Sequence, residues 1–278
     1  MTLFEHLKQL GYTKKEAKGL MNTGKVFHKS IPTSDGQRII DPHNIEVKPR
    51  APKMVPGRDP CIVHKDTGFV VVYKPANYLS VRAARRHKDP TITGFVHRIM
   101  GAAYTVHRLD EDTSGLMLVA TNEKTQEYLK TELEKRTIKR TYLALVSGHL
   151  KREQTIKSSL VRNRGDGKRG SHHDRENGKM AITHINPKKH LKGATLVEAV
   201  IETGRTHQIR IHLSENRHPV LGDLLYAPKS IQKKSKRLAL HAHTLSLKHP
   251  VSKEEMVFQA PLADDLEQLR RGLLLKKK

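Results

Sequence analysis

The sequence is poor in cysteine and in aromatic residues. It has one cysteine, Cys61, no tryptophan, and only 4% aromatic residues among its 278 positions. A single cysteine cannot form an internal disulfide, which excludes a disulfide-stabilised secreted fold and fits a reducing compartment. The scarcity of aromatic rings argues against a broad stacking platform for single-stranded nucleic acid. No apolar run reaches the roughly 18 residues of a membrane-spanning helix, and the N-terminus does not look like a secretory signal, so we expect a soluble cytoplasmic protein.

Acidic residues are also scarce relative to basic ones. The chain has 28 Asp and Glu against 52 Lys and Arg, a formal net charge of +24. Such an excess attracts a polyanion, and nucleic acid is the usual one. Binding to an anionic membrane would favour a basic amphipathic helix with a bulky apolar face, and we find none in the sequence. We therefore expect RNA or DNA as the partner, and not a membrane.

Residues 1–50 have the pattern of a small α+β unit. Leucines recur at helical spacing from Leu3 to Leu10, and Thr13 with Glu16 is typical of a capping box. Short strands are predicted at 26–28, 38–40 and 45–47. A stretch rich in proline and basic residues follows, and we place a linker at 51–59.

The remainder, 60–278, has the pattern of a larger α+β domain. Its clearest helix covers 122–136, with Asn122 as the N-cap residue. Strict alternation in QIRIHL predicts a strand with Ile209, Ile211 and Leu213 on one side and Gln208, Arg210 and His212 on the other. Apolar and β-branched runs predict strands at 69–73, 116–120, 141–146, 195–202, 208–213, 238–247 and 256–260. Strands interspersed with helices indicate a mostly antiparallel mixed sheet with flanking helices.

The segment 151–192 is strongly basic, with twelve Lys and Arg against four Asp and Glu. Its centre, RNRGDGKRGSHHDRENGK, has four glycines and no apolar residue. It is either a solvated loop or a mobile basic loop that closes over a phosphate backbone. In the second case the phosphate contacts would come from Arg162, Arg164, Lys168 and Arg169.

Several blocks of the larger domain, in order, resemble one enzyme family. HRLDEDTSGL (107–116) resembles the HRLDxxTSGL signature of the RluA family of RNA pseudouridine synthases. Matching blocks lie at 62–81, 139–148, 204–213, 218–226 and 237–250. One departure is Asn77, where the family usually has glycine after Lys-Pro-Ala; a turn tolerates asparagine at positive φ.

The resemblance implies an isomerisation that breaks the N1–C1′ bond of a uridine, rotates the base and joins C5 to C1′. It makes Asp110 the catalytic carboxylate, Arg205 its ion-pair partner and Tyr142 the residue that packs on the base. An aspartate is ionised at neutral pH and a neighbouring guanidinium would orient it. A stacked uridine cannot reach such a pocket, so it must be flipped out of the RNA. No cofactor is implied.

The resemblance also implies RNA contacts around the site and in the first 50 residues. Arg108 matches the position that intrudes into the RNA, whereas His107 is either structural or in contact with the RNA backbone. Arg210 could contact phosphate or support the active site. Residues 1–50 resemble an S4 RNA-binding domain without its usual Arg-Leu-Asp opening, and its phosphate contacts would be Lys14, Lys15, Lys18 and Lys25.

Three alternative functions differ in the residues that they would require. A metal site could use some of the eighteen histidines, such as His241 and His243 or the cluster at 172–174, but no cysteine pair or HExxH spacing supports one. An RNA hydrolase would need a second paired carboxylate, a catalytic histidine or a metal. A non-catalytic RNA-binding or ribosome-assembly factor could have lost Asp110, Tyr142 or Arg205, yet all three are present. We expect a monomeric synthase acting on structured RNA, with ribosomal RNA favoured over transfer RNA.

Overall fold

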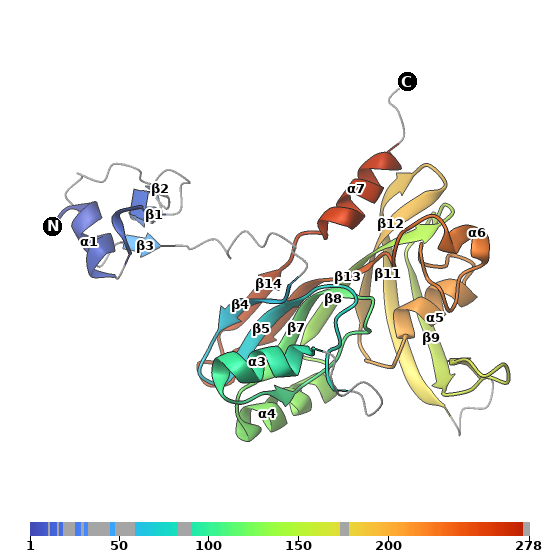
Figure 1. The fold of residues 1–278 in the computed structure, drawn as a ribbon, viewed down its shortest axis with the longest axis horizontal. Helices are drawn as coiled ribbons and strands as arrows, with labels where there is room; N and C mark the ends of the chain where they lie inside the picture. Colours follow the sequence, from blue (N-terminus) through green and yellow to red (C-terminus); the bar gives the residue numbers. More distant parts are fainter. Residues whose placement is uncertain are drawn as a thin grey trace. The chain divides into compact units, whose positions relative to one another are not determined.

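A computed structural model describes residues 1–10, 12–15, 17–18, 26–28, 31–32, 45–47, 59–82, 90–172 and 178–274. The chain divides into two compact units, Met1–Lys53 and Met54–Lys278. Figure 1 draws both units as ribbons, and each is described here by itself. Within the described residues, no helix is both long enough and apolar enough to cross a membrane.

The first unit contains a short helix and a small sheet. Helix α1 (Leu3–Gln9) begins at a capping box in which Thr2 and Glu5 each accept a hydrogen bond from the other's backbone N–H. Strands β1 (Val26–His28), β2 (Ile31–Pro32) and β3 (Ile45–Val47) form an antiparallel sheet in the order β2-β1-β3. The predicted strands 26–28 and 45–47 are confirmed. The predicted strand 38–40 and the capping residue Glu16 lie outside the described residues.

The second unit is built on one large, mostly antiparallel sheet, as predicted. Its central path runs β10-β9-β11-β12-β8-β13-β7-β5-β4, with β14 paired to β13 and β6 to β7. The only parallel pairing between its described strands is that of β13 with β7. The strands are β4 (Cys61–Lys65), β5 (Phe69–Lys74), β6 (Tyr104–Thr105), β7 (Ser114–Ala120), β8 (Lys139–Ser147), β9 (Gln154–Val161), β10 (Gly170–Ser171), β11 (Lys179–Leu191), β12 (Ala194–Ile201), β13 (Leu240–Lys248) and β14 (Glu255–Gln259).

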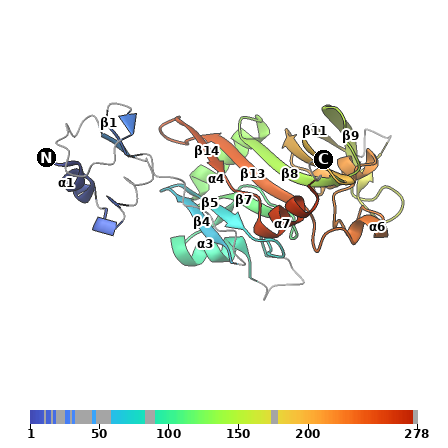
Figure 2. The same cartoon turned by 90° about the horizontal axis from the view of Figure 1, so that it is seen from above.

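Helices cover both faces of this sheet. Helix α3 (Ile92–Met100) packs against alternate residues of β5 such as Val70 and Val72, in the same core cluster as α5 (Gln208–Glu215) and α7 (Asp264–Gly272). Helix α4 (Glu123–Glu134) packs with the intervening residues, such as Val71, on the other face. Figure 2 shows α3 and α4 on opposite sides of β5 and β7. Helix α4 has the predicted N-cap, since the Asn122 side chain accepts from Thr125 N at 2.8 Å. The short helix α6 spans Lys229–Gln232.

The glycine of the HRLDEDTSGL block is required by the parallel contact of β7 with β13. Gly115 has a φ of +116°, and a Cβ there would lie 2.2 Å from the carbonyl oxygen of Ala242. Backbone atoms cannot move aside as a flexible side chain can. Only glycine fits this position without displacing β13 from β7.

Gly115→Ala is therefore expected to lower the free energy of unfolding by about 2–5 kcal/mol, which combines left-handed backbone strain with overpacking. Gly165→Ala is the matched control, because Gly165 has the same φ of +116° with nothing within 4 Å of the added Cβ. Urea unfolding of both variants measures the difference. Equal losses would mean that the contact with Ala242 contributes nothing beyond backbone strain.

The predicted strand at 208–213 is wrong, because this segment forms helix α5. All six of its residues are buried, including Gln208, Arg210 and His212. The polar side chains face protein partners instead of water: Gln208 Nε2 donates to the Ile182 carbonyl, and His212 Nδ1 lies 2.8 Å from Thr183 Oγ1. An alternation of polar and apolar residues predicts a strand only when the polar side is solvated, and here it is not.

The basic segment 151–192 contains two long strands that the sequence analysis did not predict. Strands β9 and β11 pair with each other over seven residues, and β11 pairs with β12. In β9, exposed side chains alternate with half-buried ones up to Ser158, and most of both sets are polar, so the sequence gives a weak strand signal. The loop between β9 and β11 is thus shorter than predicted, and the described part of it is held against α5.

Candidate active site

Asp110 lies in a tight turn between β6 and β7, and hydrogen bonds from three other side chains hold the backbone around it. Lys74 Nζ donates to the carbonyl oxygen of Glu111 at 2.7 Å. Ser80 Oγ donates to the carbonyl oxygen of Leu109 and accepts from its N–H. His107 Nε2 accepts from Leu118 N at 3.0 Å. Main-chain groups on both sides of Asp110 are therefore held, which restricts where its carboxylate can point.

Lys74 is fully buried, which is unusual for a lysine without a carboxylate partner. Its ammonium donates to three carbonyl oxygens, those of Pro75, Tyr78 and Glu111. Burial lowers the pKa of Lys74 to about 7, while the nearby acids Asp112 and Asp110 act in the opposite direction. Three acceptors match the three N–H bonds of an ammonium, so this geometry favours the protonated side chain. The residue links the Lys-Pro turn to the turn that carries Asp110, and Asn77 in that Lys-Pro turn has the predicted positive φ, 61°.

The carboxylate of Asp110 is paired with Arg210. Arg210 Nη1 lies 3.4 Å from Asp110 Oδ2, and its Nε and Nη2 form a bidentate pair with Asp223 at 2.8 and 2.7 Å. Arg210 is 3% exposed and Asp223 is 1% exposed. Burial alone would lower the pKa of Arg210, but the two carboxylates raise it above its usual range. Arg210 is therefore a permanently charged group that faces Asp110 from inside the protein.

A histidine approaches Asp110 from the other side. His207 Nε2 lies 3.9 Å from Asp110 Oδ1, and His207 Nδ1 lies 2.9 Å from the Tyr226 hydroxyl. His207 has a φ of 60° at the start of α5, and this conformation turns its ring toward the Asp110 turn. Burial lowers the pKa of His207, although Asp110 opposes the shift, so the neutral ring dominates at neutral pH. The predicted carboxylate thus lies between a fixed cation and a neutral hydrogen-bonding ring.

These groups line a cleft of about 460 Å³. Its wall is formed by residues from the Asp110 turn, the end of α4, β8 and the segment between β12 and α5. Tyr142 enters the cleft from β8 and is 6% exposed. Burial raises the pKa of Tyr142, so its hydroxyl is protonated at neutral pH. A flat ring, a carboxylate and several basic groups around one cavity suit a planar polar ligand.

The structure brings together most of the predicted site residues, but Arg210 and not Arg205 pairs with Asp110. Asp110 and Tyr142 line the cleft, and Arg108 and His107 lie in its wall. The predicted ion pair of Asp110 with Arg205 is not found in the described structure, because Arg210 takes that position. Arg205 is exposed on the rim, and its Nε donates to the carbonyl oxygen of Met180.

His107 has a structural contact, which is one of the two roles predicted for it. Besides accepting from Leu118 N, it is half-buried, and burial lowers its pKa to about 3, assisted by the charge of Arg140. Arg210 is buried within its ion pairs, so it is placed to support the active site and not to contact phosphate.

Sequence reasoning missed His207, Asp223 and Tyr226 as members of this site. The sequence did point to these segments, since His207 lies in the GRTHQIR block and the other two in the GDLLY block. It gave no information on how the two blocks lie relative to each other in space. The sequence did not show that the GDLLY turn places Asp223 behind Arg210 and Tyr226 beside His207.

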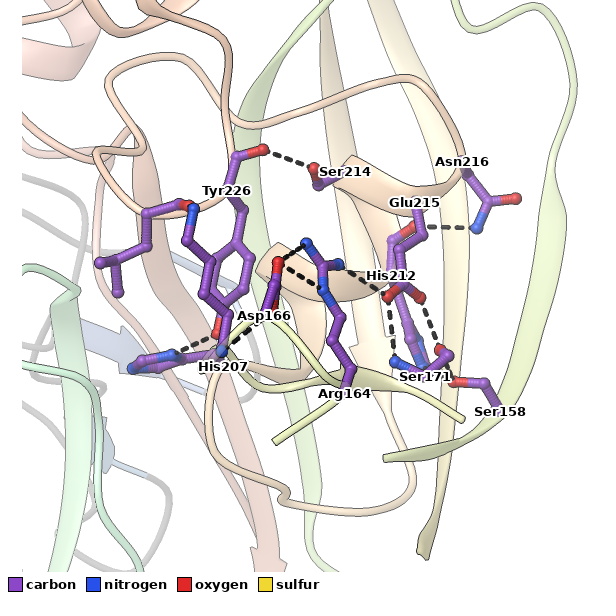
Figure 3. A network of polar contacts seen from close by, with 12 residues as sticks. Ser158, Arg164, Asp166, Ser171, His207, His212, Ser214, Glu215, Asn216 and Tyr226 are labelled. Atoms are coloured by element: carbon purple, nitrogen blue, oxygen red, sulfur yellow. Dashed lines mark hydrogen bonds and ion pairs between the residues drawn. The ribbon is translucent and has the colours of Figure 1, made fainter. Parts of the chain in front are cut away.

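Next to the cleft, the described part of the basic loop is held by a network of polar contacts (Figure 3). Arg164 pairs with Asp166 at 2.9 Å and with Glu215 of α5 at 3.4 Å. Ser171 donates its backbone N–H and its hydroxyl to Glu215. Lys168 Nζ donates to the carbonyl oxygen of Leu225 at 3.1 Å. Two of the predicted phosphate contacts, Arg164 and Lys168, are exposed but already bound to other groups of the protein.

The other two predicted phosphate contacts, Arg162 and Arg169, line a groove beside the cleft. They line this groove of about 380 Å³ together with Lys179 and Arg205, and none of the described residues that line it is acidic. In the part of the chain that the structure describes, Arg162, Arg169 and Lys179 form no ion pair with a carboxylate. The groove and the cleft share the lining segment 204–206, so they adjoin each other.

The remaining predicted residues lie elsewhere. In the first unit, Lys14, Lys15 and Lys18 are exposed, whereas Lys25 lies outside the described residues. Among the described residues, no group of three or more His, Cys, Asp or Glu side chains could hold a metal ion. His241 is buried against Ser114, and His243 Nδ1 lies 2.6 Å from the carbonyl oxygen of Ala260. The cluster at 172–174 lies partly outside the described residues.

Comparisons with known proteins agree on one family. The sequence profile described as RNA pseudouridylate synthase matches residues 68–215. Ribosomal large subunit pseudouridine synthase D of Haemophilus ducreyi is 35% identical over 230 residues, which cover 76% of this chain and 70% of that protein. The protein of the same name from Neisseria meningitidis is 33% identical over 237 residues, covering 77% of this chain and 61% of the relative. The solved structure of human RNA Pseudouridylate Synthase Domain Containing 1 superposes with a TM-score of 0.62 at 28% identity, covering 79% of this chain and 97% of the other.

Proposed function

Because the chain belongs to the RNA pseudouridylate synthase family, we propose that it isomerises uridine to pseudouridine in ribosomal RNA. The observation that carries the proposal is the carboxylate of Asp110, held against the buried Arg210 at one end of a cleft that Tyr142 lines. The alternative, a non-catalytic RNA-binding factor, has no need for a carboxylate fixed in this way.

In the proposed reaction each group has one task. Asp110 acts at C1′ or C2′ of the ribose while the N1–C1′ bond breaks, as a nucleophile or a base. Arg210 pairs with the carboxylate and orients it. The ring of Tyr142 packs on the uracil while it rotates. Arg108, which is exposed at the cleft entrance, contacts the RNA from which the uridine has been flipped.

Ribosomal RNA is favoured as the substrate for two reasons. The two bacterial relatives named above are called large subunit ribosomal enzymes. The first unit, with its exposed lysines and its helix and small sheet, suits an S4-like RNA-binding role. Transfer RNA remains the second candidate, since the cleft itself recognises a flipped nucleotide and not a particular RNA.

The test is release of tritium from RNA that carries [5-³H]uridine. Joining C5 to C1′ expels the C5 hydrogen, so the assay detects the reaction before the modified site is known. We expect release from unmodified ribosomal RNA and none from transfer RNA. Release from transfer RNA alone would overturn the substrate assignment, and tight RNA binding without release from either would favour the non-catalytic factor.

The basic groove gives a second prediction. Replacing Arg162, Arg169 and Lys179 with glutamine should weaken RNA binding and reduce the slope of log K against log salt by about 2–3, because each lost phosphate contact removes roughly 0.7–0.9. The control replaces Lys151, Arg152 and Lys192, exposed residues near the opposite ends of the same strands, and removes the same charge. Binding isotherms at several salt concentrations decide the matter. An equal change in both variants would assign the effect to net charge alone.

A further inference from the structure

One arginine in the cleft has no ion-pair partner among the residues that the structure describes. Arg140 lies on β8, lines the cleft and is 8% exposed. Its Nε is shielded from solvent and has no hydrogen-bond partner, and within the described part of the chain its guanidinium forms no ion pair. Two of the carboxylates that line the cleft pair with other arginines, Asp110 with Arg210 and Glu202 with Arg136.

A buried cation without a counter-charge is costly to the folded protein. Burial lowers the pKa of Arg140, yet a guanidinium with an ordinary pKa above about 12 stays charged at neutral pH. A charge that is desolvated and unpaired normally destabilises a fold, and an apolar side chain of similar size would avoid that cost. The protein nevertheless makes room for it: a Cβ at Gly204 would lie 2.9 Å from Arg140 Nη1. This arrangement points to a ligand group that pairs with Arg140.

The position of Arg140 on the strand indicates which group that is. Arg140 and Tyr142 are two residues apart on β8, so they project from the same face, with roughly 7 Å between their Cα atoms. Where the ring of Tyr142 packs on a uracil, the guanidinium meets an edge of the same base. Arginine can only donate hydrogen bonds, and the acceptors on the edges of uracil are its carbonyl oxygens.

We propose that Arg140 binds a carbonyl oxygen of the flipped uracil and stabilises the negative charge of the detached ring, an inference that rests on the proposed function. When the N1–C1′ bond breaks, its electron pair stays with the ring, where it is shared among N1, O2 and O4. Asp110 compensates the electron deficiency at the sugar. After rotation, a ring electron pair forms the C5–C1′ bond, C5 loses its proton and N1 gains one, so no co-reactant is needed.

The test uses Arg140→Met, which keeps the length of the side chain and removes the charge. We expect the single-turnover rate at saturating RNA to fall by about 10²–10³-fold, as for the loss of a donor to a developing oxyanion. RNA affinity should change by less than about threefold, since only one group of the substrate is affected. The urea midpoint should stay equal or rise, because an unpaired buried charge has been removed. Arg140→Lys should recover part of the rate.

Lys139→Met is the matched control, since Lys139 is the exposed neighbour on the opposite face of β8. A rate loss accompanied by a lower urea midpoint would assign Arg140 a structural role and overturn the inference. Lost affinity with an unchanged saturating rate would make Arg140 a phosphate contact, which also overturns it. If wild type releases tritium and Arg140→Met remains within threefold of it, only this inference fails. If wild type releases none, the proposed function fails with it.

Discussion

Asp110→Asn is expected to reduce tritium release by at least about 10³-fold while RNA binding stays within about threefold of wild type. Asparagine is close to aspartate in size and shape, so it can fit the same turn between Lys74 and His107 without a steric change. It lacks the charge that acts at the ribose, and it cannot serve as the nucleophile or base. The loss should therefore lie in the chemical step, which a single-turnover rate at saturating RNA measures.

Asp112→Asn provides the control for this substitution. Asp112 lies two residues along the same turn, is partly buried and does not line the cleft. The control removes an equal charge from the same segment and should keep most of the wild-type rate. A large loss of RNA affinity in Asp110→Asn would argue for a binding role, and equal rates in Asp110→Asn and wild type would place the catalytic group elsewhere.

The second large effect is expected from Arg210→Met. This change leaves Asp223 buried without its cation, and breaking a buried ion pair from one side costs about 3–5 kcal/mol of unfolding free energy. Asp110 loses its partner as well, so activity should fall even where the protein remains folded. Urea unfolding and tritium release measure the two consequences separately.

A double variant separates those consequences. Arg210→Met with Asp223→Asn removes both buried charges and keeps an acceptor for the backbone N–H groups of Leu225 and Tyr226. We expect it to recover most of the lost stability and none of the lost activity. Recovery of both would show that Arg210 contributes to catalysis only through the fold. No recovery of stability would contradict the ion-pair account.

The same pair gives a pH dependence with a defined sign. Burial alone would raise the pKa of Asp223, but Arg210 and two backbone N–H groups outweigh it and hold the pKa below its usual range. A carboxyl with a depressed folded-state pKa contributes its full stability above the unfolded value of about 4, and this is lost as pH falls through the folded value. The stability difference between wild type and the double variant should therefore shrink in acid.

The fold of the larger unit was largely predictable where strands carry apolar or β-branched runs. Strands β5, β7, β8, β12, β13 and β14 follow such runs, and α4 follows a cap and a helical stripe. The exceptions have a shared cause. In β9 and α5, polar side chains form hydrogen bonds with other residues of the protein. Their positions in the sequence therefore do not show which side of the element faces water. A pattern of hydrophobic residues predicts a helix or strand only where the buried residues are apolar and the polar residues are exposed.

The candidate site was predictable in its residue types but not in its pairings. The blocks that resemble the RluA family pointed to Asp110 and Tyr142, which share one cleft. The cation beside Asp110 could not be chosen from sequence, because GRTHQIR contains two arginines, Arg205 and Arg210. The predicted strand did not show which of the two would be buried beside the carboxylate. The helix settles the matter by burying Arg210 and leaving Arg205 on the rim. Likewise, the sequence could not show that Arg164 of the basic loop is paired, because its partner Glu215 lies about 50 residues further along the chain.

The central place of β13 has a consequence for when the site comes into existence during synthesis. In the sheet, β13 is the strand that lies between β8 and β7, with Ala242 opposite both Tyr142 and Gly115. Asp110 belongs to the β7 half, whereas Tyr142 and Arg210 belong to the other half. Until residues 240–248 have left the ribosome and entered the sheet, the two halves lack the strand that joins them. A nascent chain can therefore contain Asp110, Tyr142 and Arg210 and still lack an active site until β13 has been synthesised and has entered the sheet.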